Sequence, residues 1–278
     1  MNPRTRKKRA TRLNAPTPRA LPAVRPNAGI EAWYRRKLDD KIKEMQHSLV
    51  YWLTAEYRKA GFAEDAADGS GATKLLQASL RKQSHRWQWA FNRYADWLGK
   101  KLASRVLTNA DASLASAVKA QGFAVNFTMT ADMSNAYQAV IGENVGLIKS
   151  IASEHLTEVE GLVMRSVARG RDLGTLTKDL QARYGITRRR AALIARDQNN
   201  KATSVMTAAR QKALGITEGV WMHSHAGKVP RPEHVAADGK RFPIDKGIWM
   251  DTAGKYVMPG EEINCRCTWR PVIPGFEN

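Results

Sequence analysis

The sequence predicts an α+β fold, in which a region of long helices is followed by a small mixed module of short strands and hairpins. Two observations support this prediction. Apolar residues recur at three- and four-residue spacing through most of the chain as far as Gly215, which is the period of amphipathic helices. After Gly215 this period disappears, and short apolar runs alternate with turn residues. With 278 residues, 43% of them hydrophobic, the chain can bury a sizeable core.

Three helical stretches are expected before residue 170. The first runs from about Trp33 to a stop at Gly61, the second contains the aromatic and aliphatic positions between Trp87 and Val106, and the third covers about 135–167. The Gly- and Asp-rich residues 61–74 are predicted to form a loop between the first two. The aromatic stripe of the second helix is interpreted as core rather than as a surface for stacking bases.

A fourth helix is expected to begin at Thr187 as its N-cap and to stop at Gly215. Arg188, Arg189 and Arg190 would then lie in its first turn, where the helix dipole disfavours cations. Two interpretations remain open. Either a phosphate or an acidic partner compensates the three charges, or solvent screens a small penalty.

The residues after Gly215 predict strands within 219–225, 240–244, 247–259 and 264–273. Asp238-Gly239 and Ala253-Gly254 are expected to form hairpin turns. These patterns divide the chain into three parts: a disordered basic arm (1–30), a helical region that docks on other proteins (31–186) and a C-terminal module (187–278).

The basic arm has no acidic residue and contains five prolines, so it cannot bury apolar surface. It is expected either to contact nucleic acid or to be a solvated tail. Its cations are Arg4, Arg6, Lys7, Lys8, Arg9, Arg12, Arg19 and Arg25.

The whole chain has a formal charge of +19, from 45 Lys and Arg against 26 Asp and Glu. This excess is larger than solubility requires and indicates an anionic partner, with nucleic acid as the first candidate. The sequence contains neither an apolar signal region nor a membrane-spanning run, so we expect a cytosolic product without a membrane partner. Two cysteines in a reducing compartment are expected to be thiols or metal ligands.

Several segments resemble the phage Mu protein F-like family of minor head, or head morphogenesis, proteins over about residues 150–271. They are "ARDQNNKA" in the fourth helix, followed by "VPRPEHVAADGKRF" and "PGEEINCRCTWRPVI". The resemblance is ordered along the chain and includes several rare residues. The positions that match the family pattern are Arg231, His234, Asp238, Gly239, Pro259, Gly260, Asn264, Cys265 and Cys267.

The resemblance implies a protein that associates with the phage portal and with the major capsid or scaffold proteins, and that contacts packaged double-stranded DNA. It would act without catalysis, in the virion head near the portal and in the host cytoplasm during assembly. Two other classes remain open: an autonomous DNA-binding protein that ignores sequence, and a zinc-dependent nuclease or thiol hydrolase. A thiol hydrolase would use Cys265 and His234, oriented by a group such as Asn264.

Cys265 and Cys267 are separated by one residue, so a disulfide between them would close a small, strained ring. With His234 they offer three ligands suited to Zn²⁺, and His225 or His223 could complete a tetrahedron. The alternative is that the two thiols lie on opposite faces of a strand, unless a turn or bulge falls at Arg266.

Within the same module, Arg231 and Asp238 are expected to form a structural ion pair that fixes the hairpin. Asp238, Gly239 and Asn264 are expected to have structural roles. Zinc is the one cofactor that the sequence suggests.

Overall fold

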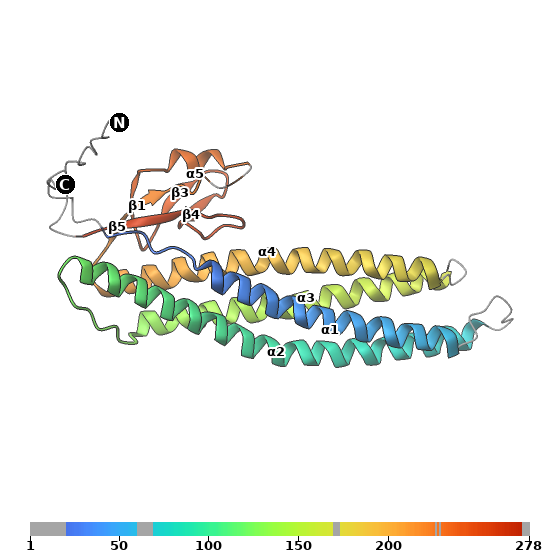
Figure 1. Ribbon diagram of the computed structural model, residues 1–278. Helices are drawn as coiled ribbons and strands as arrows, with labels where there is room; N and C mark the ends of the chain where they lie inside the picture. The colour runs from blue at the N-terminus through green and yellow to red at the C-terminus, as the bar shows by residue number, and fades with distance from the viewer. Residues whose placement is uncertain (1–20, 60–68, 169–172, 226, 228, 274–278) are drawn as a thin grey trace, which may run out of the picture.

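The computed structural model describes residues 21–59, 69–168, 173–225, 227 and 229–273. Four long helices run side by side as an elongated bundle, and a small module lies against the C-terminal half of α4 (Figure 1). This arrangement confirms the predicted α+β class. The four helices are α1 (Ala28–Lys59), α2 (Gly69–Ala120), α3 (Ala131–Ala168) and α4 (Leu173–Ala213).

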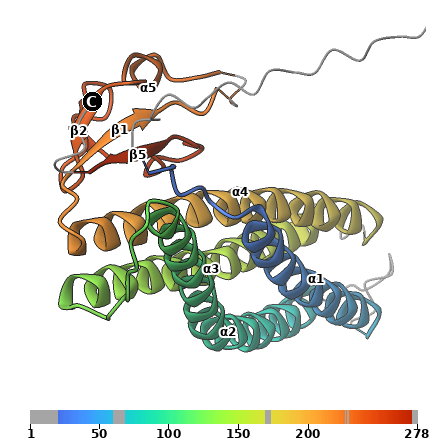
Figure 2. The same cartoon turned by 60° about the vertical axis from the view of Figure 1, so that its left-hand side comes forward.

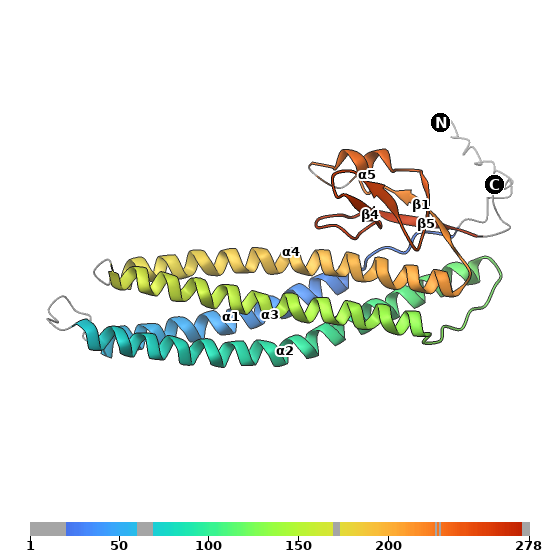
Figure 3. The ribbon, with the colours of Figure 1, turned by 180° about the vertical axis from the view of Figure 1, so that it is seen from behind.

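The bundle core follows from the apolar period of its helices. Leu38 and Ile42 of α1, Phe91 of α2 and Ile148 of α3 are completely buried, which confirms the core interpretation of the α2 stripe. Seen from behind, α3 runs between α4 and α2 (Figure 3). Gly99 allows this close packing, because a Cβ there would lie 3.1 Å from a methyl group of Val145. No helix in the described ranges combines the length and apolar character needed to cross a membrane.

Two helix starts differ from the prediction. The second helix begins at Gly69, within the expected loop 61–74, of which residues 61–68 lie outside the described residues. The fourth begins at Leu173, so the N-cap assigned to Thr187 is wrong. Thr187 is buried in mid-helix, where its hydroxyl donates to the Arg183 carbonyl and lies 2.9 Å from His155 Nδ1. The division expected at residue 187 therefore falls inside α4.

The module contains a three-stranded antiparallel sheet in the order β2-β1-β5 and a separate β3-β4 hairpin. The Ala253-Gly254 turn closes this hairpin, as predicted. Asp238-Gly239 does not join two strands directly, because α5 lies between β1 and β2 and Gly239 turns the chain after that helix. The elements are β1 (Glu218–Met222), α5 (Pro232–Ala236), β2 (Arg241–Pro243), β3 (Ile248–Met250), β4 (Lys255–Val257) and β5 (Thr268–Val272).

The module has its own core, in which Trp221, Phe242 and Trp269 meet edge to face around the sheet. Gly219 makes room for Trp269, since a Cβ at this position would lie 2.5 Å from the indole ring. Leu114 of α2 joins the same cluster and ties the module to the bundle.

The N-terminal segment before α1 also contributes to the module core. Leu21 is 2% exposed and belongs to the cluster around Trp221, while Val24 is also buried. Figure 2 shows this segment passing from α1 toward the module. The prediction of a disordered arm therefore does not hold for residues 21–30. The remainder of that arm, residues 1–20, lies outside the described residues.

Candidate functional site

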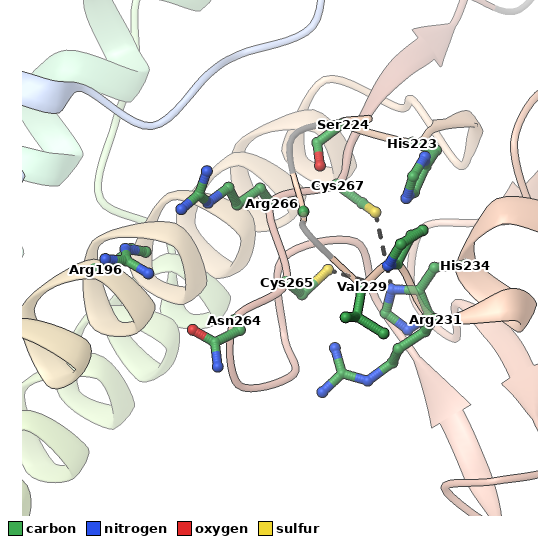
Figure 4. Close-up of a pocket in the computed structure, with 12 residues that line it drawn as sticks. Arg196, His223, Ser224, Val229, Arg231, His234, Asn264, Cys265, Arg266 and Cys267 are labelled. Carbon is green, nitrogen blue, oxygen red and sulfur yellow. Dashed lines mark hydrogen bonds between the residues drawn. The ribbon is translucent and has the colours of Figure 1, made fainter. Parts of the chain in front are cut away.

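Three side chains from two separate segments converge beside the bundle. His234 lies on α5, and Cys265 and Cys267 lie in the irregular segment that leads into β5. His234 Nδ1 is 3.5 Å from Cys265 Sγ and 3.8 Å from Cys267 Sγ, and all three residues are buried (Figure 4). They form one wall of a cavity of about 610 Å³.

The two sulfurs reach the same imidazole because Cys265, Arg266 and Cys267 are not in a strand. The chain turns at Asn264, whose φ is 62°, and the amide of Cys265 donates to the Glu262 carbonyl. This turn removes the strict alternation of a strand, which would have sent the thiols to opposite faces. Of the two arrangements predicted from the sequence, the structure therefore has the one in which a turn, here at Asn264, lets both thiols face the same side.

Glu262 orients His234 from the other side. His234 Nε2 lies 2.9 Å from Glu262 Oε2, so this nitrogen carries the proton in the tautomer that the geometry favours. Nδ1 then directs its lone pair toward the sulfurs. Arg231 supports the same carboxylate at 3.5 Å and donates to the Ile263 carbonyl.

The predicted ion pair between Arg231 and Asp238 is therefore wrong. Asp238 instead accepts the amide of His223 at 2.8 Å and lies 3.4 Å from His225 Nε2. The reason is that α5 separates the two residues. Arg231 therefore lies beside the irregular segment 261–267, here called the cysteine loop, and Asp238 lies beside the end of β1.

His225 is not part of the cluster, contrary to its assignment as a fourth ligand. Its side chain is 69% exposed and contacts Asp238 and His223. His223 lines the same cavity as the two cysteines, although its Nδ1 accepts from the His225 amide. In the described part of the chain, only His234, Cys265 and Cys267 form a group of three or more converging His, Cys, Asp or Glu side chains.

Helix α4 holds the cysteine loop in place through the motif "ARDQNNKA". The Asp197 carboxylate accepts the Asn264 amide at 2.8 Å, and the Asn200 side chain donates to the Cys265 carbonyl at 2.9 Å. Sequence reasoning missed these roles. The available signal was a run of four polar residues, Asp197 to Asn200, in a helix whose period would place some of them on the buried side.

Gly260 completes the support of the site. Its φ of 84° is accessible to glycine at little cost, and its amide donates to Cys265 Sγ at 3.3 Å. Pro259-Gly260 thus has a local physical purpose, which is to aim a backbone N–H at a sulfur. Such a hydrogen bond stabilises the thiolate form of a cysteine.

The surroundings of the two thiols shift their pKa values in opposite directions. Hydrogen bonds with Cys267, and with His234 when both of its ring nitrogens are protonated, lower the pKa of Cys265 to about 4, although burial opposes this shift. For Cys267 the shift is in the opposite direction: the hydrogen bond with Cys265 and burial both raise the pKa of this thiol. The pKa of His234 is raised, chiefly by its contact with Cys265. A thiolate beside two further ligand atoms can act as a metal ligand or as a nucleophile.

The arginines expected to bind nucleic acid have different surroundings. Arg188 and Arg190 lie in mid-helix rather than in a first turn, and they pair with Asp39 and Glu154. Acidic groups of the chain itself thus compensate two of the three charges. Arg189 is exposed, and no ion pair is found for it within the described residues. Arg4, Arg6, Lys7, Lys8, Arg9 and Arg12 lie outside the described residues.

The fold and the site define a class of protein in which a long helical bundle carries a small module built around a buried Cys-His-Cys cluster. Residues 157–270 match the family described as "Phage Mu protein F like protein", which confirms the resemblance inferred from the motifs. The matched segment begins in α3, contains all of α4 and includes the complete cluster.

A relative comes from Haemophilus influenzae (strain ATCC 51907 / DSM 11121 / KW20 / Rd), where it is described as an uncharacterized protein. The two sequences are 29% identical over 269 residues, which is 93% of this chain. The chain spans 57% of the length of that relative. No solved structure gives a significant match.

Proposed function

We propose that this protein is a minor head protein of a tailed phage, which associates with the portal and procapsid and contacts the packaged DNA. The observation that carries the proposal is the family match over residues 157–270, because this segment includes the cluster and the α4 motif that supports it. The protein would meet major capsid or scaffold proteins in the host cytoplasm during assembly. It would then reside in the virion head near the portal.

The net charge of +19 supports the contact with DNA. Residues 1–20 alone contribute seven cations and no acid, so they are suited to phosphates of any sequence. Arg189 adds an exposed cation on α4, whereas its neighbours Arg188 and Arg190 are engaged by Asp39 and Glu154.

Exposed aromatic side chains on the bundle support docking on a protein partner. Tyr51 of α1 is 67% exposed, and Trp89 and Trp97 of α2 are 61% and 44% exposed. Trp and Tyr are enriched at protein interfaces, where they bury large areas at a small cost in conformational entropy. We assign these residues to the contact with portal or capsid protein.

The docking proposal is tested by pull-down with portal protein over a range of salt concentrations. Binding through Trp89 and Trp97 should survive high salt, and the double alanine variant should weaken it by about tenfold or more. Trp249→Ala on β3 is the matched control, because this indole is also about half exposed but lies on the module. Absence of binding to portal and procapsid proteins at any salt concentration would overturn the proposal.

The DNA contact has its own experiment. Duplex binding by the full chain is compared with that by a chain lacking residues 1–20, and the slope of log affinity against log salt should fall by up to about 6. Arg189→Ala should weaken binding more than Arg188→Ala. Duplex affinity that does not depend on salt would contradict this contact, whereas strong duplex affinity without any portal binding would favour an autonomous DNA-binding protein.

The proposed role is structural and does not include catalysis. Purified protein should leave duplex DNA and peptide substrates intact, with or without added Zn²⁺. Turnover of either substrate that disappears in Cys265→Ala or His234→Ala would overturn this part and establish a zinc-dependent nuclease or a thiol hydrolase.

A further inference from the structure

We infer that His234, Cys265 and Cys267 bind one Zn²⁺ ion. The separations between their ligand atoms carry this inference. A tetrahedral zinc ion with ordinary bonds to sulfur and nitrogen sets its S···N edges at about 3.6 Å. The two observed S···N distances are 3.5 and 3.8 Å, and the three ligand atoms all lie within 4.8 Å of one another.

The surroundings of the cluster are those of a ligand set. Glu262 accepts from His234 Nε2 at 2.9 Å, which leaves Nδ1 free to donate its lone pair to a metal. Carboxylate–histidine–metal arrangements of this kind fix the tautomer and raise the basicity of the ligand. The amide of Gly260 donates to Cys265 Sγ and stabilises a thiolate there.

Burial and chemistry favour Zn²⁺ over the alternatives. The residues His234, Cys265 and Cys267 are 3%, 3% and 5% exposed, so neither sulfur is openly presented to a substrate. A hydrolase needs one thiol paired with the imidazole, whereas here both sulfurs approach the same Nδ1. Two thiolates and an imidazole select zinc rather than magnesium or calcium, which prefer oxygen ligands.

The fourth coordination position would face the cavity. Trp221 packs edge-on against the His234 ring, with 5.4 Å between ring centroids, and so closes the side toward the module core. The opposite side opens to the cavity lined by His223, Val229 and Arg231 (Figure 4). Because no fourth His, Cys, Asp or Glu of the described residues joins the group, we place a water molecule in this position.

Metal analysis of the full-length protein, purified without chelator from zinc-containing medium, tests the inference. We expect about one zinc per chain. Cys265→Ser, Cys267→Ser and His234→Ala should each lose most of it, whereas His225→Ala and His223→Ala should keep it. Glu262→Gln should retain the ion but bind it about 10–100-fold more weakly. Absence of zinc from the folded wild-type protein, or full zinc in both cysteine variants, would overturn the inference.

Cobalt substitution of the wild-type protein tests the same inference without variants, and therefore remains informative if the variants do not fold. Co²⁺ added to the folded, zinc-free wild-type protein should give the visible absorption of a tetrahedral thiolate site, and Zn²⁺ should abolish it. Zinc should also protect both thiols from alkylation by iodoacetamide. A wild-type protein that gives no Co²⁺ spectrum and presents one rapidly alkylated thiol would refute the zinc site and indicate a nucleophilic cysteine.

Discussion

The bundle and the module each bury one histidine, and the two sites use the same side chain in opposite ways. His155 of α3 is fully buried beside the Thr187 hydroxyl, and burial together with Arg183 lowers its pKa to about 4. The His234 imidazole is 3% exposed, yet its contact with Cys265 raises its pKa despite burial. Burial alone therefore does not decide the charge of a histidine. Burial, assisted by Arg183, keeps His155 neutral, whereas the contact with Cys265 outweighs burial at His234 and favours its charged form.

The two regions also differ in what stabilises them. The bundle has a long continuous apolar core shared by four helices, whereas the strands of the module have only three to five residues each. A small domain buries a smaller fraction of its surface and often needs a metal or another cross-link. The cluster at His234 lies where such a cross-link would join α5 to the segment before β5.

Removal of the zinc ion that we propose should have the largest effect, and it should destabilise the module more than the bundle. Structural zinc in small domains contributes on the order of 10 kcal/mol to folding. After chelation, hydrogen exchange should accelerate in the α5 and β5 peptides and remain slow in the core of α2 and α3. Equal acceleration in both regions would show that the module and bundle unfold as one unit.

Arg210→Ala should have the next largest effect, because this side chain links α4 to α2. The Arg210 guanidinium is 5% exposed, binds Asp111 through two nitrogens at 2.6 and 2.9 Å, and donates to the Thr128 carbonyl. Loss of one partner of a buried pair leaves the other unpaired and costs about 3–5 kcal/mol.

Urea unfolding at neutral pH measures the Arg210→Ala cost, with Arg210→Lys as the control that keeps the charge. A cost below about 1 kcal/mol for Arg210→Ala would contradict the buried-pair interpretation.

A pH titration of stability should report His155. Its pKa falls from 6.5 in the unfolded chain to about 4 in the folded protein, so the unfolded state binds more protons between these values. This contribution is fully present above pH 6.5 and is lost as the pH falls toward 4. It amounts to roughly 3 kcal/mol, at 1.36 kcal/mol per pKa unit.

Urea unfolding of wild type and His155→Gln at pH 7.5 and 4.5 measures the His155 contribution. The variant should lose this pH dependence, whereas His47→Gln, which changes an exposed histidine of α1, should keep it. An unchanged pH dependence in His155→Gln would contradict the assignment.

Arg188→Ala should have the smallest effect on stability. Its pair with Asp39 joins α4 to α1 at 3.2 Å, but the Arg188 side chain is 47% exposed. Exposed ion pairs contribute about 0–1 kcal/mol, and salt screens them. A double-mutant cycle with Asp39→Ala at low and high salt measures the coupling, and a salt-independent coupling above about 2 kcal/mol would be unexpected for this geometry.

The sequence predicted those features that depend on neighbouring residues. The apolar period of Leu38, Ile42 and Met45 was sufficient to identify α1, and the turn at Ala253-Gly254 to identify the β3-β4 hairpin. The sequence left open whether Cys265 and Cys267 share a site with His234 or lie on opposite faces of a strand, and the structure brings the three side chains together. The prediction of Thr187 as an N-cap was wrong because a threonine has two uses in a helix. It can cap the N-terminus, or, as here, it can donate to the carbonyl four residues earlier and contact a buried histidine.

By itself, the sequence determined that long helices precede Gly215 and short strands follow it, that the chain has an excess of positive charge, and that His234, Cys265 and Cys267 could bind a metal. Only the tertiary structure decided that Glu262 orients His234, that His225 lies apart, and that Asp197 and Asn200 hold the cysteine loop. The physical reason is the range of the interactions. Periodicity and turns are fixed within a few residues, whereas a hydrogen bond such as Asn200 to Cys265 joins residues 65 positions apart and exists only after the module has packed on α4.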